Sequence, residues 1–244
     1  ESLEGREAEL VAALGVDGPI AVVADPDTWD AMGARVAKAL AADGRAPREI
    51  VLAKAPLAAV AAAAALEERL AGVAHAVAVG SGTVNDLCKY VVAKDGRSSS
   101  VFATAASMDG YTSTTASIGL PSGLKVSVPS KAAVGAFLDL SVMAAAPPRT
   151  YAAGFGDCLC SSVARIDWRL SHRLFGTPYM DQPYLIAAEN DAEMTKRVDM
   201  IGRGAVEGVG YLARALILSG LGVGFTGVSN HGSMGEHQVS HYID

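Results

Sequence analysis

The chain has 244 residues, half of them apolar, and a formal net charge of −6. A chain of this length buries enough apolar surface for one large domain or two smaller ones. The negative total argues against a nucleic-acid partner, because a phosphate backbone needs a basic protein surface. No run of about 18 apolar residues is free of glycine, proline and charge, so no membrane span is expected, and the polar N-terminus has no signal-peptide core.

The first part of the chain alternates strand-like and helix-like segments. Continuous apolar runs predict buried parallel strands at 19–24, 49–53, 76–79 and 101–103, with a further short strand at 136–140. Helical spacing and an alanine-rich tract predict helices at 6–14, 28–42, 56–69 and 84–90. A hairpin or extended arm is expected at 112–129. This order predicts an α/β, Rossmann-like parallel sheet over residues 1–147.

The character of the sequence changes at Pro147-Pro148, after which strand-like runs disappear. We therefore expect a second, all-helical domain at 148–244, with turns at 176–178, near Pro183 and at 220–227. The three cysteines, Cys88, Cys158 and Cys160, lack disulfide or metal-ligand spacing, which indicates a reducing, cytoplasmic compartment. Cys158 and Cys160 are expected to be small buried residues.

Gly80-Ser81-Gly82 breaks the apolar run 76–79 and leads into a helix. Such a junction presents backbone N–H groups and a helix N-terminus to an anion, usually a phosphate. The turn is not a full G-x-G-x-x-G fingerprint, because Asn85 stands where the third glycine would be, and an ordinary strand–helix turn is the alternative. Asp86, on the first turn of the helix, favours the functional interpretation.

A second polar cluster follows the strand predicted at 101–103. Thr104 and Ser107 offer hydroxyls to a pyrophosphate or a nicotinamide carboxamide, and Asp109 offers an acceptor to substrate hydroxyls. Asp25, at the end of the first strand, can accept from the ribose hydroxyls of a dinucleotide. It can equally cap the next helix, with Pro26 at the first helical position, and both interpretations stay open.

Three residues of the second part are candidates for metal or substrate binding. Asp157 is expected just inside the first helix after the boundary, where an N-terminal acid that favours the helix dipole is the plain alternative. His237 and His241 are four residues apart and share a helix face, so both can be metal ligands, or one can bind metal while the other contacts substrate. A pair of structural histidines is the competing interpretation. His231 stays unassigned.

Taken together, these motifs resemble the sn-glycerol-1-phosphate dehydrogenase family. That family belongs to the superfamily of glycerol dehydrogenase, iron-containing alcohol dehydrogenase and dehydroquinate synthase. The resemblance runs from about residue 20 to the end and rests on Asp25 and on the segments 79–86 (VGSGTVND), 104–110 (TAASMDG), 154–157 (GFGD) and 235–241 (GEHQVSH). The segments 104–110 and 235–241 are its most specific parts.

The resemblance implies a dehydroquinate synthase-like fold, an NAD(H) or NADP(H) cofactor and one divalent metal, with Zn expected and Ni or Fe as alternatives. The cofactor residues it implies are Asp25, Gly80, Ser81, Gly82, Thr83, Val84, Thr104, Ser107 and Ser113, to which the helix position of Asp86 adds one more. Asp157 and His237 would bind the metal, and the catalytic set would be Asp109, Asp157 and His241.

The implied reaction interconverts dihydroxyacetone phosphate and sn-glycerol 1-phosphate by hydride transfer. The expected protein is a cytoplasmic homo-oligomer, and its expected binding partner is the substrate, a small phosphorylated polyol. The alternatives are a glycerol or polyol dehydrogenase, a dehydroquinate synthase-like lyase, and a non-catalytic nucleotide-binding relative. Ser81 replaces the middle glycine of the family turn. The family's third metal ligand lies in a later His-Gly segment, so the helical domain is expected to be incomplete here.

Overall fold

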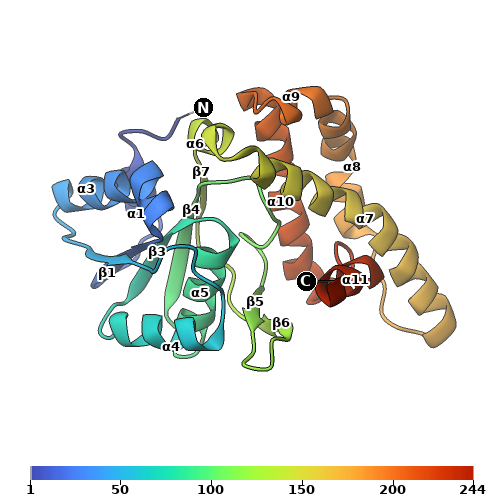
Figure 1. Cartoon of the computed structure of the whole chain (residues 1–244), viewed down its shortest axis with the longest axis horizontal. Helices are drawn as coiled ribbons and strands as arrows, with labels where there is room; N and C mark the ends of the chain where they lie inside the picture. Colours follow the sequence, from blue (N-terminus) through green and yellow to red (C-terminus); the bar gives the residue numbers. More distant parts are fainter. Residues whose placement is uncertain (1, 244) are drawn as a thin grey trace. The chain divides into compact units, whose positions relative to one another are not determined.

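The computed structural model describes residues 2–243, except for the side chain of His241, and divides the chain into two compact units (Figure 1). The α/β unit comprises the residues up to Ala105 and Thr115–Ala146. The helical unit comprises Ala106–Thr114 and the residues from Pro147 onward. The second unit therefore takes in residues 106–114, which the expected boundary assigned to the first.

The α/β unit is built on a five-stranded sheet in the order β2-β1-β3-β4-β7, with every neighbouring pair parallel. The strands are β1 (Ile20–Ala24), β2 (Arg48–Val51), β3 (His75–Gly80), β4 (Ser98–Ala103) and β7 (Ala136–Leu138). Val22 of β1 stands opposite Glu49 on one side and Val77 on the other. β1 and β3 are buried along their whole length, as their continuous apolar sequences predict.

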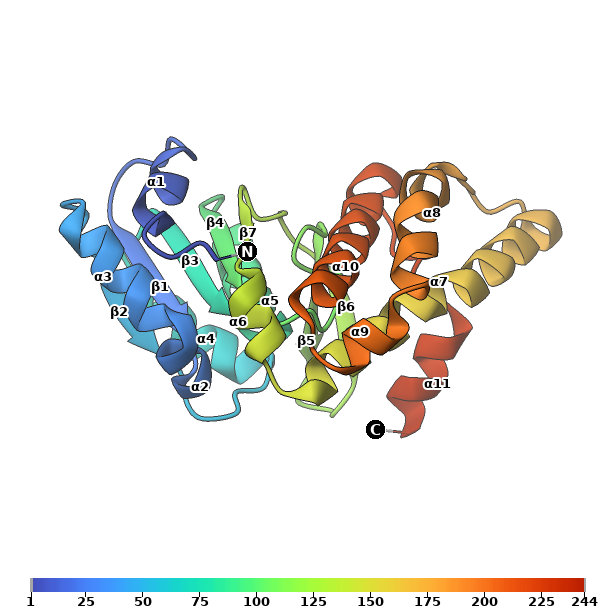
Figure 2. The ribbon, with the colours of Figure 1, turned by 90° about the horizontal axis from the view of Figure 1, so that it is seen from above.

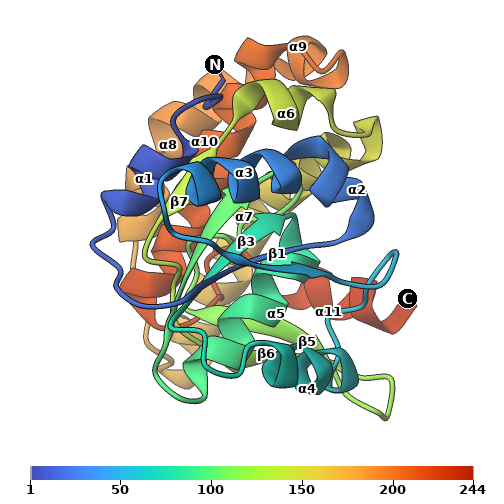
Figure 3. The same ribbon diagram turned by 90° about the vertical axis from the view of Figure 1, so that its left-hand side faces the viewer.

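Helices cover both faces of this sheet, with α1 and α3 on one face and α4 and α5 on the other (Figures 1 and 3). Their bounds are α1 (Glu7–Ala12), α2 (Pro26–Thr28), the π-helical η1 (Trp29–Gly33), α3 (Ala34–Ala42), α4 (Val60–Arg69), α5 (Gly82–Ala93) and α6 (Leu140–Ala145). The main apolar core lies between the sheet and α3, and includes Val22, Val77, Phe102 and Leu40. Burial of each such side chain stabilises the fold by about 1.5–3 kcal/mol.

The segment expected as a hairpin or arm is an antiparallel hairpin of β5 (Thr115–Gly119) and β6 (Lys125–Pro129). Two hydrogen bonds attach it to α5. The Ser117 N–H donates to Asp86 Oδ2 at 3.0 Å, and the fully buried Lys89 donates from Nζ to the Thr115 carbonyl at 2.6 Å. Burial raises the pKa of Asp86 above its ordinary value, with nearby Lys89 working in the opposite direction.

The helical unit consists of α7 (Pro148–Phe175), α8 (Gln182–Thr195), α9 (Val198–Gly202), α10 (Val206–Thr226) and α11 (Gly235–Ile243) together with residues 106–114. α10 packs against α7, α8 and α9, and α11 packs against α7 (Figure 2). The turn after α7 begins at Gly176, whose positive φ of 70° ends the helix. Pro183 stands in the first turn of α8.

The turn predicted at 220–227 is wrong, because α10 continues through Gly220 to Thr226 and ends at Gly227 with a φ of 72°. The reason for a glycine at 220 is close packing. A Cβ there would collide with the carbonyl oxygen of Asp109 and the hydroxyl of Thr112. On α7, a Cβ at Gly154 would collide in the same way with the carbonyl of Ala106. These two glycines let residues 106–114 lie directly on α7 and α10.

α10 is the one helix among the described residues that is long and apolar enough to cross a membrane by length and composition. Half of its most apolar window is buried within the fold. It packs against three other helices, which is the role of a central helix in a folded domain. Length and composition alone are therefore weak evidence for a membrane span.

Candidate active site

The glycine turn is a tight junction between β3 and α5. Gly80 ends β3, Ser81 has an extended conformation, and α5 begins at Gly82. A Cβ at Gly80 would stand 2.8 Å from the side chain of Val84, so the close approach of strand and helix requires glycine. Asn85 N donates to the Ser81 carbonyl, which leaves the N–H groups of the preceding helical residues outside the intrahelical ladder. Binding of an anion by these N–H groups of Gly82, Thr83 and Val84 stays a prediction.

Asp25 stands at the same edge of the sheet, because β1 and β3 are parallel neighbours and Asp25 directly follows β1. Its Oδ1 accepts from the Thr28 N–H at 2.9 Å, and its own N–H donates to Thr28 Oγ1 at 3.1 Å. With Pro26 at the start of α2, this is a complete capping box. The capping interpretation of Asp25 is confirmed, and its contact with a ribose stays a prediction.

The carboxylate of Asp86, which the sequence suggested as a cofactor contact, forms hydrogen bonds within the α/β unit. Its Oδ2 accepts from Ser117 N, and its Oδ1 lies 3.3 Å from the Asn85 side-chain amide. Both carboxylate oxygens therefore have partners within the α/β unit, and one of them fastens β5 to α5. The carboxylate of Asp86 orders the hairpin beside the glycine turn, and a direct contact between Asp86 and a cofactor stays a prediction.

The remaining cofactor candidates are divided between the two units. Thr104 directly follows β4, is 5% exposed, and donates its N–H to the Gly80 carbonyl at 3.1 Å. Ser107 and Ser113 belong to the segment 106–114 of the helical unit. Ser113 is buried, and its hydroxyl donates to the Gly110 carbonyl at 3.1 Å.

In the helical unit, Asp109 and Asp157 are directly connected. The Asp109 N–H donates to Asp157 Oδ2 at 3.0 Å, and Ser219 Oγ donates to Asp109 Oδ2 at 2.8 Å. Asp157 lies in the third turn of α7, which begins at Pro148, and the helix dipole acts mainly within the first turn. The helix-dipole interpretation of Asp157 is therefore wrong.

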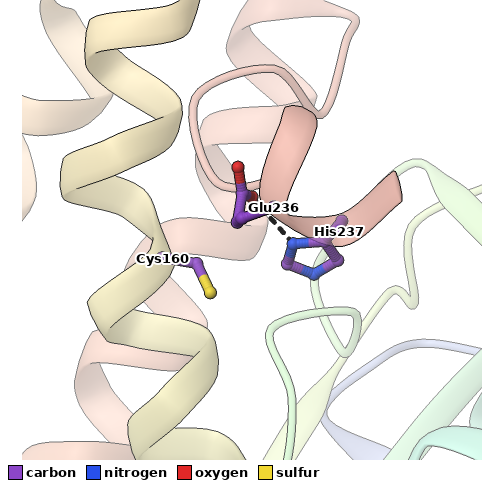
Figure 4. Close-up of side chains that lie close together, drawn as sticks. All are labelled: Cys160, Glu236 and His237. Atoms are coloured by element: carbon purple, nitrogen blue, oxygen red, sulfur yellow. Dashed lines mark hydrogen bonds and ion pairs between the residues drawn. The ribbon is translucent and has the colours of Figure 1, made fainter. Parts of the chain in front are cut away.

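His237, on α11, places each ring nitrogen near a carboxylate. Its Nε2 lies 3.5 Å from Asp157 Oδ1, and its Nδ1 lies 2.9 Å from Glu236 Oε1. The hydrogen bond with Asp157 raises the pKa of His237 to about 9, and Glu236 adds to this, while burial works against it. Figure 4 shows Glu236 and His237 on α11 and Cys160 on α7.

The donor atoms at Asp157 and His237 fit a divalent metal. Bonds of about 2.0–2.2 Å at a tetrahedral zinc separate two ligand atoms by about 3.4 Å, close to the observed 3.5 Å between Oδ1 and Nε2. Metal-binding histidines usually donate their other ring N–H to a carboxylate, as Nδ1 can to Glu236. His241 follows one turn later on α11, but its side chain lies outside the described residues.

Sequence reasoning missed three residues of this region. Glu236 and Ser219 position His237 and Asp109, and the adjacency of Glu236 to His237 in the sequence is the one available signal. His231 is buried, with Nε2 2.9 Å from the Ser219 carbonyl, and its ring lies over Gly222 of α10. It attaches the loop before α11 to α10, which explains why a histidine without an assigned function occurs there.

Comparison with known proteins adds independent information. Residues 1–147 match the family model described as iron-containing alcohol dehydrogenase. The glycerol-1-phosphate dehydrogenase (NAD(P)+) of Bacillus velezensis is 32% identical over 232 residues, covering 91% of this chain and 58% of that protein. The protein of the same name from Pyrococcus horikoshii is 34% identical over 174 residues, covering 71% of this chain and 50% of that protein. The chain thus spans between half and three fifths of the length of these relatives.

Solved structures agree with the fold. Glycerol dehydrogenase from Schizosaccharomyces pombe superimposes with a TM-score of 0.77 at 20% identity, over 98% of this chain and 62% of that chain. A halo-thermophilic archaeal alcohol dehydrogenase from a Red Sea brine pool gives a TM-score of 0.76 at 15% identity, over 98% and 66%. These neighbours confirm the dehydroquinate synthase-like fold, a parallel-sheet part followed by a helical part. With the relatives above, they confirm the resemblance that the motifs indicate.

Proposed function

Because the chain belongs to the iron-containing alcohol dehydrogenase family, we propose that it acts in an NAD(P)H-dependent, metal-dependent oxidoreductase. The proposed reaction interconverts dihydroxyacetone phosphate and sn-glycerol 1-phosphate by hydride transfer. The relatives from Bacillus velezensis and Pyrococcus horikoshii are both named glycerol-1-phosphate dehydrogenase, which supports this substrate pair. The observation that carries the proposal is the cluster of Asp109, Asp157 and His237 in the helical unit.

The residues of the α/β unit would hold the cofactor. The N–H groups at the start of α5, from Gly82 to Val84, would donate to the pyrophosphate. Asp25 Oδ1 accepts from Thr28 N in the helix cap, and Asp25 Oδ2 would accept a hydrogen bond from a ribose hydroxyl. A bound nicotinamide supplies the hydride chemistry, and the protein supplies position and electrostatic field.

The residues of the helical unit would hold the substrate and a divalent metal, for which we expect zinc, with nickel or iron as alternatives. Asp157 and His237 are the proposed ligands, and a bound ion would polarise the carbonyl or hydroxyl oxygen of the substrate. Asp109, held by Ser219 and by its own N–H, would accept a hydrogen bond from a substrate hydroxyl. His241, one turn beyond His237, is proposed to contact the substrate.

Two further parts of the proposal are the cellular location and the oligomeric state of the protein. Cys88, Cys158 and Cys160 are free thiols, which supports a reducing, cytoplasmic location. A homo-oligomer is expected from the family resemblance. Light scattering after gel filtration measures it directly, and a monomer at working concentration would contradict it.

The test follows NADH oxidation with dihydroxyacetone phosphate, in metal-stripped protein with and without added Zn²⁺. His237→Ala should lose the metal-dependent rate and retain less metal by mass spectrometry, while binding NADH as the wild type does. His172→Ala is the matched control, because His172 is an exposed histidine at the end of α7. Wild-type metal content in His237→Ala would show that the ligand assignment is wrong.

The substrate assignment needs a separate comparison. Glycerol and sn-glycerol 1-phosphate are supplied in parallel with NAD⁺, and the phosphorylated substrate should give the larger kcat/KM. Equal or better turnover of glycerol would replace the phosphate proposal with a polyol dehydrogenase. Turnover of a phosphorylated substrate without net change in NADH absorbance would indicate a lyase.

A further inference from the structure

Cys160 brings a thiol to the side of α7 that carries the proposed metal ligand Asp157, close to His237 and Glu236. It lies one turn after Asp157 on α7 and is half-buried, whereas the sequence analysis expects a small buried residue. One ligand atom each from Cys160, Glu236 and His237 lies within 4.8 Å of the others (Figure 4). The group combines a thiol, a carboxylate and an imidazole, the three donor types that zinc accepts in proteins.

Glu236 provides a second, independent observation at the same place. Its Oε1 accepts from Met234 N at 2.9 Å and lies 2.9 Å from His237 Nδ1. Its Oε2 is fully buried and has no hydrogen-bond partner among the described residues. A buried carboxylate oxygen without a protein partner is costly, and a bound cation would satisfy it.

The two ring nitrogens of His237 have different carboxylate neighbours. Nε2 faces Asp157, whereas Nδ1 faces Glu236. A cation held by Cys160 and Glu236 therefore reaches His237 at Nδ1. A neutral imidazole cannot both bind a metal at Nδ1 and donate its Nδ1 proton to Glu236, so the two arrangements compete for one ring.

We propose that Cys160, Glu236 and His237 form a second divalent-metal site, selective for ions that accept thiolate, such as Zn²⁺, Cd²⁺ and Co²⁺. On binding, the Cys160 thiol releases its proton to solvent and the sulfur coordinates the ion as a thiolate. Ligand atoms at a tetrahedral ion stand about 3.3–3.8 Å apart. The three donor atoms, all within 4.8 Å of one another, reach this spacing by small side-chain movements. The site shares His237 with the proposed dehydrogenase centre and does not depend on the proposed reaction.

Cobalt absorption tests this site directly. Metal-stripped, reduced protein is titrated with Co²⁺ in the absence of cofactor and substrate, and the thiolate-to-cobalt charge-transfer band in the near ultraviolet is recorded. The wild type should develop the band, and Cys160→Ser should lose it. Cys158→Ser is the matched control and should keep it, because Cys158 is also a half-buried thiol of α7 but is not part of the group.

A second variant makes the test independent of the cysteine. Glu236→Gln should weaken Cd²⁺ binding at the thiolate site by about tenfold or more, because it removes a charged ligand. Circular dichroism checks that each variant is folded. No band in the wild type, or a band that survives in Cys160→Ser, overturns the proposal. An active dehydrogenase without the band overturns the second site alone, whereas an inactive protein with the band supports it and bears only against the proposed function.

Discussion

Gly154 offers the sharpest test of how the helical unit holds its acidic residues. It stands on α7 where a Cβ would lie 2.9 Å from the Ala106 carbonyl carbon and 3.0 Å from Leu216 Cδ1, and would overlap the carbonyl oxygen itself. Gly156, two residues later on the same helix, is exposed and has no atom within 4 Å of the equivalent position. The pair separates helix propensity from packing.

The magnitudes follow from these contacts. Alanine at either position favours the helix by about 1 kcal/mol over glycine. At Gly154 this gain is opposed by overpacking, about 1–3 kcal/mol, since backbone and not a flexible side chain must move. Displacement of residues 106–109 also weakens the hydrogen bond from Asp109 N to Asp157, worth about 1.5–3 kcal/mol for a charged acceptor. Gly154→Ala should therefore destabilise the protein by about 3 kcal/mol, and Gly156→Ala should stabilise it by about 1 kcal/mol.

Urea unfolding of the wild type and the two variants, followed by circular dichroism, gives the three free energies of unfolding. Gly154→Ala should also lower kcat with dihydroxyacetone phosphate, because Asp109 moves with its segment, while Gly156→Ala should keep the wild-type rate. Equal free energies of unfolding for the two variants would refute the close-packing argument. A destabilised Gly154→Ala with full activity would refute the link between this packing and the position of Asp109.

Two further predictions concern buried charge in the α/β unit. Burial of His75 lowers its pKa to about 4, below its ordinary value of about 6.5. Between these values the unfolded chain binds a proton that the folded protein does not bind. The folded protein should therefore lose about 2 kcal/mol of stability as the pH falls from 7 to 5. Urea midpoints at both pH values should show this drop in the wild type and a smaller one in His75→Gln; an equal drop would contradict the assignment. Arg35 forms ion pairs of 2.6 Å with Glu7 and with Asp139, both almost fully buried. Arg35→Leu removes the cationic partner of two buried carboxylates and should cost about 3 kcal/mol or more. Urea unfolding at neutral pH measures this, and a loss under about 1 kcal/mol would contradict it.

The sequence predicts the parts of this fold that depend on local pattern. β1 and β3 each have a neighbouring strand on both sides and are buried along their whole length, so continuity of the apolar pattern is enough to find them. The failures come from contacts between distant residues. Glycine is typical of turns, so Gly220 suggests a turn in the sequence. In the structure a glycine is needed there because a Cβ would collide with the carbonyl oxygen of Asp109, more than one hundred residues earlier.

The candidate site shows the same division. The spacing of His237 and His241 on one helix can be read from the sequence, and α11 contains both. Asp86 could not be interpreted in this way, because its partner, Ser117, lies on a hairpin that only the fold brings next to α5. Whether Asp157 serves a helix end or a binding site depended on where α7 begins, which Pro148 sets nine residues earlier.

The segment 106–114 makes the helical unit discontinuous along the chain. It follows β4 and precedes β5, yet it belongs to the helical unit with α7 and α10. The contact of Asp109 with Ser219 closes a loop of 110 residues, so the ordering of this acidic residue must wait for nearly the whole chain during folding. A fragment that begins at Pro147 would expose the glycine-lined surfaces of α7 and α10 and lack Asp109. A single cut in the sequence therefore cannot separate the two units.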